Sequence, residues 1–279
     1  MDFLKIAEKY RVVFFDAYGV LKSSSGILAG LQATLDGLQE RGIEFYILSN
    51  DASRSPQEMA AAYSLHGIEQ LGEERNISSG IMARDFLQAK VKQGKVAYLG
   101  KPNSAYYIES AGLEAVPISE IDIHQADGIK ALVFLDDDGF DWYQDLNKAL
   151  NLLLRKNMPA IVANSDHSYP ASLDESAIAI GSLAEMVEKI VGKNFIFFGK
   201  PDSQIFSYGF ELAKQNLKDL QKQDILMVGD TLTTDIIGGN KFGIDTMLVL
   251  SGNTLPQKAR LQIKTTGIIP THICTSIVS

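Results

Sequence analysis

Short apolar runs alternate with longer segments of helical periodicity along almost the whole chain. Runs of four or five apolar residues bounded by Gly, Asp, Asn or Ser predict strands, and apolar residues at three- and four-residue spacing predict helices. The predicted strands are Val12–Phe15, Phe45–Leu48, Val96–Leu99, Ala131–Leu135, Ala160–Ala163, Phe195–Phe198, Ile225–Val228 and Thr246–Leu250. The predicted helices are Leu28–Arg41, Pro56–His66, Ser79–Lys92, Ser104–Ala111, Trp142–Arg155, Ser182–Ile190, Ser203–Leu217 and Thr234–Phe242. This alternation indicates an α/β fold with parallel sheet and crossover helices.

Polar residues directly follow four of the predicted strands. In open parallel sheets the ligand crevice lies beyond the carboxyl ends of the strands, so these residues are candidates for a site. The four segments are Asp16–Val20, Ser49–Ser53, Gly199–Asp202 and Gly229–Asp235. Taken singly, most of them are more typical of a turn or a helix N-cap than of a site. Their joint occurrence, each after an apolar strand, favours a site.

Three carboxylates in these segments, Asp16, Asp230 and Asp235, predict a metal site. Carboxylate oxygens are ligands for a hard dication such as Mg²⁺, which keeps several waters and takes the rest of its shell from substrate oxygens. Magnesium fits better than zinc because no Cys or His lies nearby in the sequence. Asp16, which follows a strand and precedes a tight turn, is also a candidate nucleophile.

The remaining polar residues at these strand ends suit an anion. Lys200 places one ammonium among the acids, where it can neutralise a nucleophile and a transferring phosphoryl group. Ser49 and the backbone N–H groups of Asn50 and Asp51 lie at a strand-to-helix transition and form a candidate anion cradle. A site built from both signs of charge in this way is typical of phosphate binding.

Composition and charge limit the class of protein and its partners. Hydrophobic residues make up 46% and charged residues 22%, which is typical of a soluble globular protein. The net charge is −8, and no basic run could follow a phosphate backbone, so nucleic acid is not an expected partner. No apolar stretch reaches the roughly 18 residues of a membrane span, and the charged amino terminus lacks a signal-peptide core. With Cys274 as the single cysteine, we expect a cytoplasmic protein.

The four segments together resemble the motifs of the haloacid dehalogenase-like (HAD) phosphohydrolases. The likeness is to the class IIA sugar-phosphatase-like branch, related to 4-nitrophenylphosphatases and phosphoglycolate phosphatases, and it covers nearly the whole chain. Residues 49–55, Ser-Asn-Asp-Ala-Ser-Arg-Ser, look like the family's Thr-Asn-Asn-Ser-x-Arg-Ser stretch. The resemblance implies that Asp16 forms an aspartyl-phosphate, that Ser49 binds phosphate and that Lys200 is the lysine of the third motif.

The resemblance also implies how a magnesium ion is held. Asp16 and Asp230 correspond to magnesium ligands, and Asp235 corresponds to the second acidic residue that holds the metal shell. The position of Tyr18 implies a magnesium contact through its backbone carbonyl, which does not depend on the side chain.

The spacing of the motifs locates an insertion. Ser49 and Lys200 are 200 − 49 = 151 residues apart, whereas only 33 residues separate Asp16 from Ser49. In the resembling branch this interval holds an α/β cap that selects the substrate. We therefore expect a discontinuous Rossmann-like core of residues 1–79 and 182–279 and an inserted cap of residues 80–181. The strands of the cap sheet are expected near Val96, Ala131, Ala160 and Ala177.

Two segments of the expected cap are candidates for substrate contact. Residues 163–166, Ala-Asn-Ser-Asp, look like the branch's Ala-Thr-Asn-Pro-Asp segment, which makes Asn164 and Asp166 candidates, although a strand-end turn explains them equally well. The three consecutive acids Asp136–Asp138 can repel an anionic substrate tail or favour a neutral or cationic one. We favour a solvated loop as the interpretation of this run.

Tyr18 departs from the resembling family, which has an acid/base Asp two positions after the nucleophile. A phenol with a pKa of about 10 can donate a proton but is a poor base, so weak turnover is expected. The favoured function is a Mg²⁺-dependent phosphatase or phosphotransferase that acts on a small, sugar-phosphate-like metabolite, in a chain that is compatible with a homo-oligomer. A catalytically impaired phosphometabolite-binding or regulatory protein is the alternative. Carbon–halogen hydrolysis is a weaker third, because Asp-Ala-Tyr-Gly also matches the first motif of 2-haloacid dehalogenases.

Overall fold

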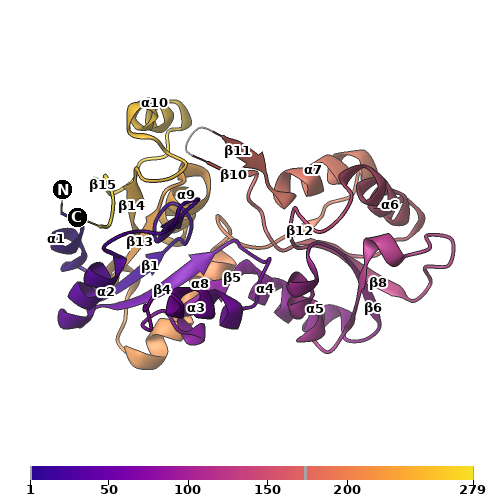
Figure 1. Cartoon of the computed structure of the whole chain (residues 1–279), viewed down its shortest axis with the longest axis horizontal. Helices are drawn as coiled ribbons and strands as arrows, with labels where there is room; N and C mark the ends of the chain where they lie inside the picture. The colour runs from indigo at the N-terminus through magenta and orange to yellow at the C-terminus, as the bar shows by residue number, and fades with distance from the viewer. Residues whose placement is uncertain (1, 173–174, 279) are drawn as a thin grey trace.

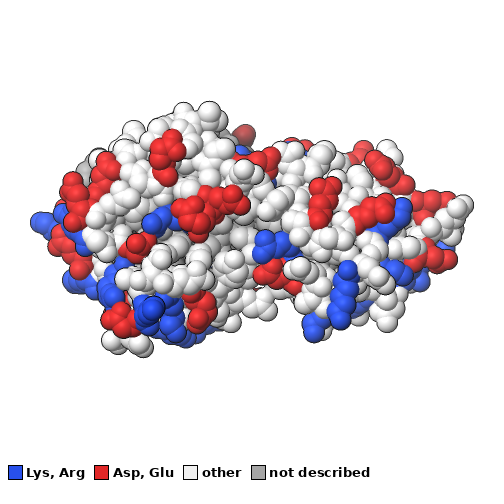
Figure 2. All heavy atoms as spheres, turned by 90° about the horizontal axis from the view of Figure 1, so that it is seen from below, with Lys and Arg blue, Asp and Glu red and all other residues white. Residues whose placement is uncertain are grey.

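The chain forms two α/β lobes, each around its own parallel sheet, in the computed structural model, which describes residues 2–172 and 175–278 (Figure 1). Both ends of the described chain lie in the first lobe, and the middle of the chain forms the second. Figure 2 shows acidic and basic side chains interspersed over one face of both lobes. None of the described helices is long and apolar enough to cross a membrane.

The first lobe is organised by a six-stranded sheet in which all neighbouring strands are parallel. In spatial order the strands are β15 (His272–Cys274), β14 (Asp245–Val249), β13 (Ile225–Gly229), β1 (Val12–Phe15), β4 (Glu44–Ser49) and β5 (Asn76–Ser78). The chain begins at the centre with β1, moves to one edge through β4 and β5, and later fills the other side. Because the strand order reverses beside β1, ligands are expected beyond its carboxyl end.

Helices cover both faces of this sheet. The helices α1 (Phe3–Ala7) and α2 (Leu31–Glu40) pack on one face, and α8 (Ser203–Asn216) and α9 (Ile237–Phe242) pack on the other. Phe15 of β1 belongs to the first of these clusters and Phe14 to the second. Burial on both faces explains why β1 is a continuous apolar run rather than an alternating one. The lobe also carries α3 (Pro56–Ser64) and α10 (Pro256–Thr266).

The second lobe has a five-stranded parallel sheet. Its spatial order is β12 (Ile196–Phe197), β9 (Ala160–Val162), β8 (Ile129–Phe134), β6 (Lys95–Leu99) and β7 (Glu114–Pro117). One face is covered by α6 (Trp142–Arg155) and α7 (Ile180–Val191), and the other by α4 (Ser79–Phe86) and α5 (Tyr106–Glu109).

Two short antiparallel ribbons lie outside both sheets. The first pairs β2 (Lys22–Ser23) with β3 (Gly26–Ile27), and the second pairs β10 (Ser168–Pro170) with β11 (Ser176–Ile178). Ala177, which we expected in the cap sheet, therefore lies in a separate ribbon.

The predicted α/β class with parallel sheets is confirmed, and all eight predicted strands overlap observed ones. Element ends differ where the backbone geometry changes. The helix α2 begins only after Gly30, whose φ of 89° is left-handed. The predicted helix at 79–92 continues beyond α4 as a π-helical segment. That segment is η2 (Leu87–Val91). The other 3₁₀ and π segments are η1 (Glu73–Arg75), η3 (Pro102–Ala105), η4 (Ile118–Glu120), η5 (Lys222–Asp224) and η6 (Leu232–Ile236).

The second lobe includes elements beyond the 80–181 range expected for the cap. The strand β12 pairs with β9 through Ile196↔Ile161 and Phe197↔Val162, and Leu183 and Val187 of α7 pack in the same lobe's core. We therefore infer that the inserted unit extends to about residue 198, because its sheet and core are incomplete without these residues.

Candidate active site

Three acidic side chains that lie far apart in the sequence meet at the carboxyl end of the first sheet. One carboxylate oxygen from each of Asp16, Asp230 and Asp235 lies within 4.8 Å of the other two. Asp16 follows β1 and Asp230 follows β13, and these strands are parallel neighbours, so their carboxyl ends meet at the same edge. Asp235 lies one turn further on, in η6. The structure thus brings together the carboxylates that the sequence predicted as a metal site.

The ammonium of Lys200 lies between these acids and is almost completely buried, with 2% of the residue exposed. Its Nζ is 2.5 Å from Asp16 Oδ1 and 2.7 Å from Asp235 Oδ1. Burial disfavours the charged amine, but the two carboxylates outweigh burial and hold the pKa of Lys200 above its ordinary value. Lys200 therefore remains a cation in contact with the candidate nucleophile.

The acids outnumber the cation that contacts them. Burial, together with repulsion from Asp16, raises the pKa of Asp235 to about 7 and raises that of Asp230 well above its ordinary value. Lys200 offsets only part of this effect at Asp235. An all-oxygen donor set with surplus negative charge fits a hard dication such as Mg²⁺, which would stabilise the ionised carboxylates.

Gly19 allows the turn after β1 to approach Asp230. Its φ of 79° is left-handed, and a Cβ atom at this position would lie 2.0 Å from Asp230 Oδ2. The same carboxylate accepts hydrogen bonds from Thr231 Oγ1 at 2.7 Å and from the backbone N–H of Asn253 at 2.7 Å. Asp230 is thus fixed against the turn that carries Asp16 and Tyr18.

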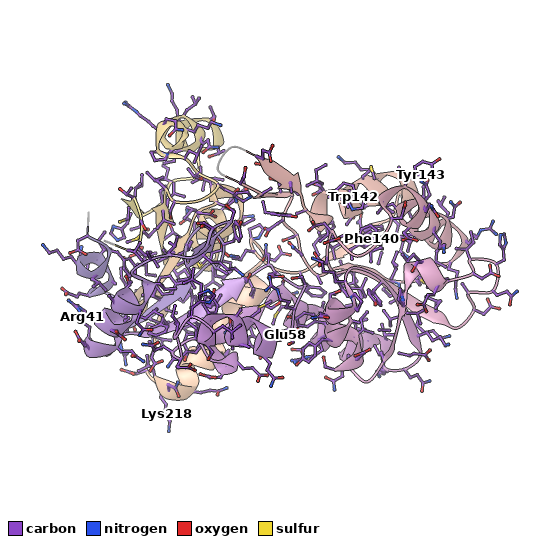
Figure 3. All side chains as sticks on the ribbon, in the orientation of Figure 1. Arg41, Glu58, Phe140, Trp142, Tyr143 and Lys218 are labelled. Atoms are coloured by element: carbon purple, nitrogen blue, oxygen red, sulfur yellow. The ribbon has the colours of Figure 1, made fainter. Side chains whose placement is uncertain are left out.

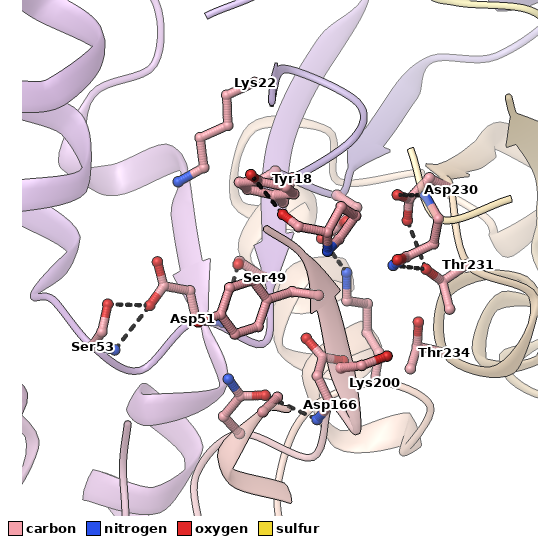
Figure 4. A pocket seen from close by; sticks show the side chains of 18 of the residues that line it. Tyr18, Lys22, Ser49, Asp51, Ser53, Asp166, Lys200, Asp230, Thr231 and Thr234 are labelled. Carbon is pink, nitrogen blue, oxygen red and sulfur yellow. Dashed lines mark hydrogen bonds and ion pairs between the residues drawn. The ribbon is translucent and has the colours of Figure 1, made fainter. Parts of the chain in front are cut away.

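The predicted phosphate cradle lies at the end of β4, across the pocket from these acids. Ser49 Oγ accepts a hydrogen bond from the N–H of Asp51 at 3.1 Å, and Asp51 Oδ1 accepts from both the N–H and the hydroxyl of Ser53. Figure 4 shows Asp51 and Ser53 on one side of the pocket and Asp230 on the other. The carboxylate of Asp51 thus orders the loop that follows Ser49.

Asn50 joins the two lobes through its side chain. Its Nδ2 donates to Lys200 O at 2.9 Å, to Asp166 Oδ1 at 2.9 Å and to Ser165 Oγ at 3.2 Å, and its Oδ1 accepts from Lys200 N at 2.7 Å. The sequence predicted Asn50 as a phosphate-binding residue through its backbone N–H. Its side chain has a separate role, because it positions Lys200 and the second lobe.

Asn164 and Asp166 lie just beyond β9 and line the same cavity as Asp16. The backbone N–H of Asp166 donates to Asn164 Oδ1 at 2.9 Å. Burial raises the pKa of Asp166 to about 6, and the charge of Lys200 opposes this shift. The structure thus brings both predicted substrate-contact residues of the second lobe to the candidate site.

The side chain of Tyr18 points toward the second lobe. It is partly buried, and its hydroxyl donates to the carbonyl of Pro170 in β10 at 3.0 Å. The phenol therefore contacts the β10–β11 ribbon.

Both lobes line a cavity of about 980 Å³ that contains these residues. The cavity is also lined by Arg54 of the 49–55 stretch, and by three residues that the sequence did not single out: Lys22 of the first lobe and Lys101 and Tyr169 of the second. Lys22 and Tyr169 directly follow no apolar strand of the predicted set, so their signal is spatial. Lys101, in contrast, follows the predicted strand Val96–Leu99 in a Gly-Lys-Pro sequence like that of Lys200, and this pattern could have found it. The cavity therefore carries cations on the first lobe in addition to Lys200.

The run of three acids in the second lobe is not a uniformly solvated loop. Asp136 is only 9% exposed, and burial raises its pKa to about 6, partly opposed by Lys101. Asp138 is exposed and forms an ion pair with Lys101 Nζ at 2.9 Å, which lowers its pKa. The expectation of a solvated loop is therefore wrong for Asp136, because this residue packs into the cavity wall.

Comparisons with known proteins give consistent likenesses. Residues 13–114 match a family described as haloacid dehalogenase-like hydrolase, and residues 197–278 match one described as HAD-hydrolase-like. A solved structure from Cytophaga hutchinsonii, described as a possible sugar phosphatase of the HAD superfamily, is 49% identical, covers 100% of this chain and 98% of its own, and has a TM-score of 0.95.

Two curated relatives are more distant. The dihydroxyacetone phosphatase of Corynebacterium glutamicum is 25% identical, over 94% of this chain and 87% of its own. The glycerol-3-phosphate phosphatase of Gallus gallus is 28% identical, over 95% of this chain and 89% of its own.

Removing the Lys200 ammonium tests the electrostatics of the site. We expect Lys200→Met to lower the free energy of unfolding by about 3–5 kcal/mol in EDTA, because it leaves buried carboxylates without their cation. The matched variant Lys101→Met removes a half-exposed ion pair, so it should cost at most about 1 kcal/mol. Urea unfolding of both variants measures this, and equal losses would contradict the proposed charge balance.

The pH dependence of stability tests the burial of Asp136. Its pKa is raised from 3.8 to about 6 in the folded protein, so stability is lost as pH rises through that value. Asp136→Asn removes this loss, so the melting temperature of the variant should gain on wild type as pH rises from about 4 to about 6 and keep that gain at higher pH. Asp138→Asn, which removes a carboxylate of lowered pKa, should not gain over the same range. If the melting temperatures of Asp136→Asn and wild type change in parallel with pH, the burial of the Asp136 carboxyl is refuted.

Proposed function

Since this chain belongs to the haloacid dehalogenase-like (HAD) superfamily, in its sugar-phosphatase and 4-nitrophenylphosphatase branch, we propose that it is a Mg²⁺-dependent phosphatase of small phosphorylated metabolites. It is a hydrolase of the phosphate-monoester class. The observation that carries the proposal is the contact of Lys200 with Asp16 and Asp235 beside Asp230, at the end of a parallel sheet and facing a cavity lined by both lobes.

The first chemical step belongs to Asp16. One carboxylate oxygen attacks phosphorus, the bond to the ester oxygen breaks, and an aspartyl-phosphate forms. Lys200 and the Ser49 hydroxyl stabilise the charge on the equatorial oxygens during this step, as does the N–H group of Asn50. The N–H of Asp51 instead donates to Ser49 Oγ and orients that hydroxyl. In the second step water attacks phosphorus, the bond between phosphorus and the Asp16 oxygen breaks, inorganic phosphate is released and the carboxylate is restored.

The residues that would hold magnesium are Asp16, Asp230, Asp235 and the carbonyl of Tyr18. When bound, the ion supplies positive charge that stabilises the phosphoryl oxygens in the transition state. Asn164 and Asp166 of the second lobe are placed to contact the part of the substrate that is not transferred.

The contact between Tyr18 and Pro170 favours weak turnover of alkyl phosphates. The hydroxyl donates its hydrogen bond to a backbone carbonyl, so it is not directed at a leaving group and does not protonate it. Esters whose leaving group departs as a stable anion, such as 4-nitrophenyl phosphate, should be the better substrates. The same contact supports a second candidate, a phosphometabolite-binding protein with little turnover.

Substitution of the nucleophile tests the mechanism. We expect Asp16→Asn to lower Mg²⁺-dependent hydrolysis of 4-nitrophenyl phosphate by roughly 10³-fold or more. The control Asp219→Asn, at an exposed carboxylate of the same lobe, should retain wild-type activity. Tyr18→Asp should raise turnover of an alkyl phosphate by up to roughly 10²-fold, because it supplies an acid and base. Wild-type activity in Asp16→Asn would eliminate the mechanism, and halide release from 2-chloropropionate without added metal would support dehalogenation instead.

Metal removal and return test the ion site. Magnesium at about 100 times its Kd should stabilise EDTA-treated protein by about 2.7 kcal/mol, which raises the melting temperature by several degrees. Asp230→Asn should abolish the shift, whereas Asp219→Asn should keep it. The absence of a shift in wild type would argue against a resident magnesium, and a shift without hydrolysis would favour the binding protein.

A further inference from the structure

Tyr18 connects the turn beside the nucleophile to a ribbon of the other lobe. Its hydroxyl donates to the carbonyl of Pro170, 152 residues away in the sequence, at 3.0 Å. Pro170 is the last residue of β10, which pairs with β11 in the register Ser168↔Ile178 and Tyr169↔Ala177. A single hydroxyl therefore links the loop of the proposed nucleophile to the β10–β11 ribbon.

The residue before Pro170 is attached to a different wall of the cavity. The hydroxyl of Tyr169 donates to Asp137 Oδ2 at 2.9 Å, and Asp137 lies beyond β8 of the second sheet. Of these two neighbouring residues of β10, Pro170 thus accepts a hydrogen bond from the first lobe, and Tyr169 donates one to the second lobe. The ribbon is held between these two attachments.

The chain leading into the ribbon is fixed to the first lobe as well. Ser165 Oγ donates to the carbonyl of Lys200 at 2.7 Å, and Asp166 accepts from Asn50 at 2.9 Å. The attachments at Ser165 and Asp166 lie close to Lys200, whereas the attachment at Pro170 depends on Tyr18. Loss of the Tyr18 hydroxyl would therefore remove the attachment of the ribbon to the turn beside Asp16, and leave its base and the contact between Tyr169 and Asp137 in place.

The ribbon forms part of the cavity that contains the nucleophile. Tyr169, Pro170 and Ser176 line it together with Asp16 and Tyr18. The position of β10 consequently contributes to the shape of the cavity on the side of Tyr18, which Figure 4 labels among the residues lining the pocket.

We infer that Tyr18 is a positioning residue whose hydroxyl holds the β10–β11 ribbon as a wall of the cavity and so determines which phosphate esters fit beside Asp16. The part of this inference that concerns phosphate esters rests on the proposed function, whereas the contact with the ribbon can be measured without turnover. The Tyr18 hydroxyl acts through the ribbon and does not touch the reacting atoms.

Hydrogen–deuterium exchange of Tyr18→Phe tests the contact directly. The variant keeps the ring and loses the hydroxyl, so amides of β10 and β11 should exchange roughly two- to tenfold faster than in wild type. Tyr143→Phe is the matched control, because Tyr143 lies on α6 at the outer side of the second lobe and is 82% exposed (Figure 3). Its exchange should equal wild type. Unchanged exchange of the ribbon in Tyr18→Phe would overturn the inference.

Kinetics with 4-nitrophenyl phosphate and Mg²⁺ give the second readout. A loosened wall should raise the KM of Tyr18→Phe roughly two- to tenfold, with a smaller change in kcat. A large fall in kcat with unchanged KM and unchanged exchange would place the hydroxyl at the reacting atoms and overturn the inference. If Asp16→Asn keeps wild-type activity, or if wild type does not hydrolyse the ester, the proposed function fails, and the exchange measurement alone still decides the role of Tyr18.

Discussion

The buried ammonium of Lys200 holds together a site that would otherwise consist of mutually repelling carboxylates. It contacts Asp16 and Asp235 directly, while its backbone carbonyl accepts hydrogen bonds from Asn50 and Ser165. One residue therefore balances charge at the sheet edge and anchors the second lobe beside it. A buried cation of this kind fixes geometry because each partner is costly to lose. The cavity, the acid cluster and the lobe junction all share this anchor.

The arrangement of the site follows from the parallel sheet, which is why much of it could be predicted from the sequence. Buried strands of this sheet are continuous apolar runs, so β1 and β13 were recognisable, and the polar residue after each run marked its carboxyl end. Strand adjacency then brought Asp16 and Asp230 together without further information. The bonds of Lys200 were not predictable in detail, but its place after an apolar run was.

Other features depend on contacts that leave no periodic signal. The strands β10 and β11 have three residues each and are largely exposed, so they do not form apolar runs. The apolar sequence of β12 would suit a strand of either sheet, and only its pairing with β9 assigns it to the second lobe. Asp136 is buried although it belongs to a run of acids, because it packs into the wall of the cavity. Sequence patterns record which residues are apolar, but they do not record which lobe covers them.

The Asn50 side chain has a consequence for how the two lobes are joined beside the cavity. Beside the cavity, this amide donates to Ser165 and Asp166 of the second lobe, and Ser165 in turn donates to the carbonyl of Lys200. Hydrogen bonds of this kind are replaced by water when two surfaces separate, so breaking them costs little net free energy. Domain interfaces that are polar commonly allow relative motion. The lobe junction at Asn50 is therefore a polar contact of the kind that water can replace, and it lies directly beside a charged centre that is buried.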